Sequence, residues 1–223
     1  MSKRIGSQVR EIKTTSEKTK FSLGILAVMA LCTFLLIIAT FTKLSLFYYA
    51  PHFGGMFGTD PNSSNSMFSL FHYEYIPQIP VVVYIAALLG PIYAVISVFA
   101  YLLLGLSFFP IFALGGGYKY IFQYNFGYIL AYIPAVIIVT KNIKKKFSYR
   151  ASMKACILAV LSVHLIGIMY AITLGLLKRE PYEFILNWIV AQSFSKMIYD
   201  IVFSFFAILL AKISKKILWI VIG

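Results

Sequence analysis

The sequence has 223 residues, of which 61% are hydrophobic and 12% are charged, and its formal net charge is +13. A mean hydropathy of +0.86 excludes an ordinary water-soluble domain. The charge does not indicate nucleic-acid binding, because the basic residues gather in three tracts between apolar segments. We therefore predict an all-α membrane protein with a single transmembrane domain, residues 1–223.

The first apolar segment, residues 21–42, follows a basic segment, residues 1–20, that we expect in the cytoplasm. A signal peptide shows a similar order, but this apolar segment is longer, and no small-residue cleavage site follows it closely. We expect a retained membrane span. Residues 43–75 then form a long extracellular loop, which is either a lid over a site or a solvated connection.

The region from Tyr75 to Tyr118 contains no Asp, Glu, Lys or Arg. It is too long for one crossing, since about 20 apolar residues span the hydrocarbon of a bilayer. Gly90 and Pro91 predict a sharp backbone break inside it. The break divides the region into two spans, residues 76–89 and residues 92–109, of which the first is short.

Three further apolar segments follow, at residues 120–140, 155–177 and 184–211, and they bring the number of predicted transmembrane helices to six. With the N-terminus inside, fifteen Lys and Arg residues fall on the cytoplasmic side. Only four fall outside, namely Lys43, Lys119, Lys178 and Arg179. The positive-inside rule therefore places both termini in the cytoplasm.

Lys196 and Asp200 interrupt the last apolar segment, where charged groups cost several kcal/mol. Their spacing places them on one helix face. If the span begins at Phe184, the pair lies past the midplane. If it begins near Ser193 or Ser195, where a serine can cap a helix, the pair lies near the outer mouth, which we favour. The pair either belongs to a binding site or only fixes helix packing.

A second group of candidate residues lies near the predicted outer edge of the membrane. Three consecutive glycines permit close approach of a ligand to the main chain, and the amides that follow offer both donors and acceptors, with aromatic rings as apolar walls. The members are Gly115, Gly116, Gly117, Gln123, Asn125 and Tyr128.

The sequence offers no support for catalysis, a metal or a cofactor. Cys32 and Cys156 lie in apolar spans, where a thiol behaves as a small hydrophobe. The three histidines lack zinc-site spacing, and there is no P-loop, GxSxG motif or carboxylate pair.

Several short motifs follow one another in a specific order. They are Pro77-Gln78-Ile79-Pro80, Leu89-Gly90-Pro91, Tyr101-Leu102-Leu103-Leu104-Gly105, Phe109-Pro110-Ile111-Phe112-Ala113, the three glycines and Phe126-Gly127-Tyr128-Ile129-Leu130. This order resembles the BioY family, the biotin-specific S-components of energy-coupling-factor (ECF) vitamin transporters. The resemblance covers residues 76–139, and the rest of the chain is similar in topology.

The resemblance implies a six-helix protein of a prokaryotic cell membrane that binds biotin near its outer side and catalyses nothing. Its partners would be a transmembrane coupling protein and two cytoplasmic ATPases. Asp200 would accept from a ureido N–H, and Asn125, Gln123 or Lys196 would donate to the ureido carbonyl. The alternatives are an S-component for another small vitamin and a stand-alone small-molecule carrier.

The chain departs from the family pattern at three positions. Val82 and Tyr84 stand where the family commonly has Thr and Gln, and Phe203 stands where it commonly has a Lys after the Asp that Asp200 matches.

Overall fold

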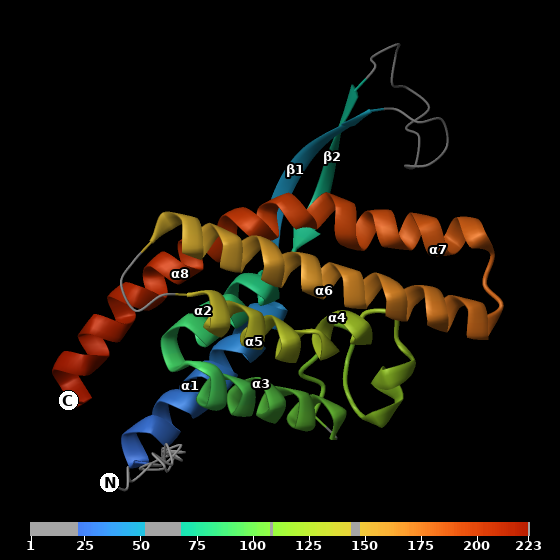
Figure 1. Cartoon of the computed structure of the whole chain (residues 1–223). Coiled ribbons are helices and arrows are strands. Elements are labelled where there is room, and N and C mark those ends of the chain that lie inside the picture. The colour runs from blue at the N-terminus through green and yellow to red at the C-terminus, as the bar shows by residue number, and fades with distance from the viewer. Residues whose placement is uncertain (1–21, 52–67, 108, 144–147, 223) are drawn as a thin grey trace, which may run out of the picture.

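The computed structural model describes residues 22–51, 68–107, 109–143 and 148–222. Figure 1 shows a helical bundle with one β-hairpin. Its elements in chain order are α1 (Leu23–Phe41), β1 (Leu44–Pro51), β2 (Phe68–Tyr75), α2 (Gln78–Leu89), α3 (Pro91–Leu106), the 3-10 helix η1 (Tyr118–Phe122), α4 (Phe126–Leu130), α5 (Tyr132–Asn142), α6 (Tyr149–Lys178), α7 (Tyr182–Ile189), the π-helical turn η2 (Val190–Phe194) and α8 (Ser195–Ile222).

Six apolar helical segments are present in the described residues, and six were predicted. Three are long enough and apolar enough to cross a membrane, namely α1, α6 and the continuous stretch Tyr182–Leu218. Three are shorter apolar segments, Gln78–Leu89, Pro91–Leu106 and Phe126–Asn142. The basic segment at residues 1–20 and the lysines at 144–146 lie outside the described residues.

The all-α prediction requires one correction, because the predicted extracellular loop carries an antiparallel hairpin. The register pairs Leu44 with Tyr75 at its base, where Lys43 and Glu74 form an ion pair of 2.6 Å. Aromatic residues recur along both strands, and such residues favour extended backbone. Residues 52–67 of the loop lie outside the described residues.

The break at Gly90 is confirmed. Gly90 has a φ of 78°, a conformation that side-chain-bearing residues rarely adopt, and α3 begins directly after it at Pro91. Proline suits a first helical position, since it lacks an amide hydrogen that would have no partner there.

The span predicted at residues 120–140 has different bounds and an internal turn in the structure. Its first residues belong to the separate 3-10 helix η1, and the apolar helical segment is Phe126–Asn142, in which a turn at Ala131 separates α4 from α5. Pro134 has no amide hydrogen to donate to the carbonyl of Leu130, so the helical ladder is interrupted there.

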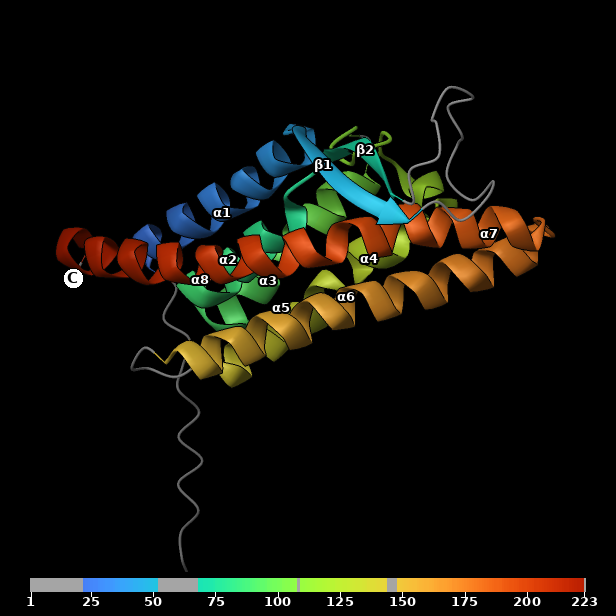
Figure 2. The same cartoon turned by 90° about the horizontal axis from the view of Figure 1, so that it is seen from above.

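The two long C-terminal rods, α6 and α7–α8, run antiparallel beside each other, with α2 and α5 packed against them (Figures 1 and 2). In both views α1 and α6 begin, and α5 and α8 end, at one end of the bundle, termed here the inner end. The hairpin and the α6–α7 connection lie toward the opposite, outer end. Fully buried side chains of four helices form the centre, among them Val82, Tyr101, Val136 and Val160.

Candidate ligand site

A small polar cavity of about 100 Å³ lies between the helices. Residues of η1, of η2 and of the loop that precedes η1 contribute to its wall. Carboxylate, ammonium, imidazole, amide and phenol groups converge on it, which is the pattern of a ligand site. Its lining comprises Ile76, Gln78, Ile79, Ala113, Tyr120, Asn125, Tyr128, Ile129, Tyr132, His164, Gln192, Lys196 and Asp200.

Asp200 is the buried anion of this cavity and is only 2% exposed. The hydroxyl of Tyr75, at the end of β2, donates to its Oδ1 at 2.6 Å. Nε2 of His164, on α6, lies 3.1 Å from its Oδ2. A buried carboxylate needs such partners, and these two come from separate elements, β2 and α6, and orient its two oxygens.

Lys196 lies one helical turn before Asp200 and also lines the cavity. Its ammonium donates to Oε1 of Gln192 at 2.6 Å. Gln192 belongs to the π-helical turn η2, and such a turn, which often occurs at functional sites, changes where the following side chains point. The predicted start of the last helix near Ser195 agrees with α8, although the rod continues on both sides of η2.

Tyr128 and Tyr120 form aromatic walls of the cavity. The hydroxyl of Tyr128 is hydrogen-bonded to Oγ of Ser193 at 2.7 Å, which ties α4 to η2. The hydroxyl of Tyr120 is buried and has no hydrogen-bond partner among the described residues. Burial raises the pKa of the Tyr120 hydroxyl above its ordinary value, so this group stays protonated and can donate to a ligand oxygen.

Gln78 organises the side of the cavity nearest α1 and α3. It accepts from the hydroxyl of Tyr132 at 2.7 Å, and its Nε2 donates to Oγ1 of Thr40 at 2.7 Å and to the hydroxyl of Tyr101 at 3.1 Å. Four helices therefore meet in one polar network. Gln78 was not among the predicted site residues, and its local signal in the sequence is its place between Pro77 and Pro80.

We expect Gln78→Leu to lower the free energy of unfolding by about 1–3 kcal/mol, because the buried hydroxyl of Tyr132 loses its acceptor. Thermal unfolding of the purified protein in detergent measures the change. Gln123→Leu is the matched control, since Gln123 is exposed and should leave the unfolding temperature unchanged. Equal stability of both variants would contradict a structural role for the network.

The predicted site residues divide into two groups. Asp200, Lys196, Asn125 and Tyr128 all line the cavity. Gln123 is exposed and does not line it, and the glycine triplet does not line it either, although the nearby Ala113 does. The polar residues that line the cavity but were not predicted from the sequence are Gln78, Tyr120, Tyr132, His164 and Gln192.

The three glycines instead close a tight loop. A Cβ on Gly116 would lie 2.1 Å from the carbonyl oxygen of Phe109, a backbone atom that cannot rotate away. Gly115 and Gly117 have φ of 114° and 86°, in the region that favours glycine. The loop is held by bonds from the amide of Gly117 to the carbonyl of Gly105 at 2.8 Å and from that of Phe112 to Gly115 at 2.8 Å.

The family model for the BioY family matches residues 73–219. The chain belongs to the BioY family. A solved structure described as the S-component for biotin from an ECF-type ABC transporter has a similar fold, with a TM-score of 0.61. It is 19% identical and the match covers 86% of this chain and 90% of that one. No curated protein matches.

The departures of this BioY chain from the family pattern lie away from the cavity. Val82 is fully buried in the apolar core. The hydroxyl of Tyr84 donates to Oγ of Ser214 at 3.0 Å, and the ring of Phe203 packs against that of Tyr75 with 5.4 Å between centroids. Phe203 therefore packs against Tyr75, the donor to Asp200, and does not itself line the cavity.

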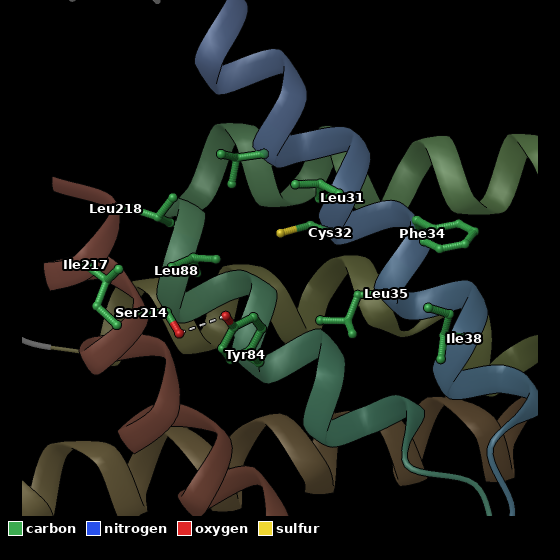
Figure 3. A pocket seen from close by; sticks show the side chains of 11 residues that line it. Leu31, Cys32, Phe34, Leu35, Ile38, Tyr84, Leu88, Ser214, Ile217 and Leu218 are labelled. Atoms are coloured by element: carbon green, nitrogen blue, oxygen red, sulfur yellow. Dashed lines mark hydrogen bonds between the residues drawn. The ribbon is translucent and has the colours of Figure 1, made fainter. Parts of the chain in front are cut away.

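A larger hollow of this BioY protein lies between α1, α2 and α8 (Figure 3). It has a volume of about 480 Å³ and is lined mainly by aliphatic residues. Its two hydroxyl groups, those of Tyr84 and Ser214, bond to each other, and no charged side chain is among the residues that line it. The smaller polar cavity is therefore the better candidate for a vitamin site.

Proposed function

We propose that this protein is the biotin-binding S-component of an ECF-type importer, which binds the vitamin from outside and delivers it across the cell membrane without catalysing a reaction. The observation that carries the proposal is the buried carboxylate of Asp200 in a polar cavity, within a chain of the BioY family. The solved biotin S-component of similar fold supports the same ligand.

The lining groups suit the ureido ring of biotin, which offers two N–H donors and one carbonyl acceptor. Asp200 retains lone pairs to accept from N–H, while Asn125, Lys196 or Tyr120 can donate to the carbonyl. Sites that enclose a drug-sized ligand usually measure about 300–1,000 Å³. Biotin binding to a cavity of about 100 Å³ therefore requires lining side chains to move outward.

The distribution of described basic residues supports cytoplasmic termini. Lys141, Arg150, Lys154, Lys212, Lys215 and Lys216 lie on the segments at the inner end, where α5 and α8 finish and α6 starts. Lys119, Lys178 and Arg179 belong to segments at the outer end. The sequence has no P-loop, so the energy for release inside would come from two cytoplasmic ATPases acting through a transmembrane coupling protein.

Calorimetric titration of the purified protein in mild detergent, without partners, tests this function. We expect one biotin to bind per chain, while thiamine and riboflavin produce no heat of binding. Binding of another vitamin in place of biotin, or of none, would contradict the proposal.

A further inference from the structure

We infer that His164 is a ligand-binding residue of this site: Nε2–H of its ring donates a hydrogen bond to Asp200, and Nδ1 accepts a hydrogen bond from an N–H group of the ligand. The inference rests on the proposed function and deepens it.

The first observation is a buried nitrogen without a partner. His164 is 2% exposed, and its ring lines the cavity. Nε2 is engaged by Asp200 at 3.1 Å, whereas Nδ1 has no hydrogen-bond partner among the described residues. Leaving a buried polar atom unpaired costs about 1–3 kcal/mol, so such an atom at a cavity wall requires an explanation. A ligand that supplies the missing hydrogen explains it.

The second observation is the arrangement that selects the tautomer. The carboxylate of Asp200 accepts from Tyr75 at its other oxygen, so it is held as an acceptor on both sides. The imidazole nitrogen that faces it must therefore carry the proton, and in the neutral ring the second nitrogen is then a bare acceptor. The ring of Tyr128 packs edge-on to His164, with centroids 5.9 Å apart, and limits its rotation.

The charged groups near the ring both come from α8. The carboxylate of Asp200 holds Nε2, and Lys196 lines the same cavity, where its ammonium donates to Gln192. The other polar lining groups near the ring are phenols and amides, so Nδ1 remains available to a ligand.

Removal of the Nδ1 acceptor should therefore weaken biotin binding by about tenfold or more, because one N–H group of the bound ligand would be left buried without a partner.

The test is calorimetric titration with biotin at neutral pH for the wild type, His164→Leu, His164→Gln and Tyr75→Phe. Leucine has no acceptor, so His164→Leu should bind biotin at least about tenfold more weakly than the wild type, and glutamine, which offers both a donor and an acceptor, should recover part of this loss. Tyr75→Phe removes the other donor to Asp200 but keeps Nδ1, so it should lose less affinity than His164→Leu.

The outcomes separate this inference from the function on which it rests. Wild-type affinity in folded His164→Leu would overturn the role of His164 and leave the biotin site intact. Equal losses in His164→Leu and Tyr75→Phe would assign the effect to the orientation of Asp200 and would also overturn it. No biotin binding by the wild type would overturn both proposals.

Discussion

Replacing Asp200 by Asn is expected to weaken biotin binding by about 30-fold or more, which corresponds to about 2 kcal/mol or more. Asparagine keeps the shape of the side chain but removes the charge. Its amide hydrogens would also face either the hydroxyl of Tyr75 or Nε2 of His164, both of which donate to the carboxylate. Calorimetric titration near neutral pH measures the loss.

Glu74→Gln is the matched control for this change. Glu74 is an exposed carboxylate paired with Lys43 at the base of the hairpin, and an exposed ion pair contributes about 0–1 kcal/mol. Its biotin affinity should equal that of the wild type. If folded Asp200→Asn binds biotin as tightly as the wild type does, Asp200 is not part of the site.

Gly167→Ala should weaken biotin binding by about tenfold or more and should also lower stability, because overpacking typically costs about 1–3 kcal/mol. A Cβ at Gly167 would lie 2.5 Å from ring atoms of Tyr128. Tyr128 is held by Ser193 at 2.7 Å and lines the cavity, so it can yield only by moving α4 or by entering the cavity. Titration and thermal unfolding measure the two effects.

Gly175→Ala on the same helix separates this effect from the change in helix propensity. Its Cβ would meet the side chain of Ile185, with Cδ1 at 2.6 Å and Cγ1 at 2.7 Å, and Ile185 does not line the cavity. Both substitutions add the same methyl group to α6. Both therefore gain the same helix propensity, which is about 1 kcal/mol more favourable for alanine than for glycine. Equal biotin affinity of the two variants would show that the close approach of Tyr128 to α6 does not shape the site.

Most helical segments were predictable because their signals are local. The segment predicted at residues 21–42 is α1, that at 76–89 is α2, and the boundary between α2 and α3 follows from Gly90 and Pro91. The hairpin was missed because its strands are 16 residues apart in the chain, at 51 and 68, and pairing between them has no local hydropathy signature. The turn at Ala131 was not predicted, because the missing amide hydrogen of Pro134 acts within an otherwise uninterrupted apolar segment, and hydropathy does not show the loss of one backbone donor.

The site was only partly predictable. Charge in an apolar span pointed to Asp200 and Lys196, and amide and aromatic side chains near the glycines pointed to Asn125 and Tyr128; the structure brings these four residues to one cavity. The glycine triplet does not line the cavity, and its role in the site stays a prediction, since a loop that folds closely on itself and a loop that approaches a ligand need the same residue.

By itself, the sequence determined that this is a helical membrane protein with a charged pair on the last helix and a resemblance to the BioY family, because hydropathy, breakers and motif order are properties of neighbouring residues. Only the tertiary structure decided which groups surround Asp200. Tyr75 is 125 residues away from it and His164 is 36 residues away, and no periodicity along the chain encodes such contacts. They arise when β2, α6 and α8 pack together and a buried carboxylate takes the donors that packing brings to it.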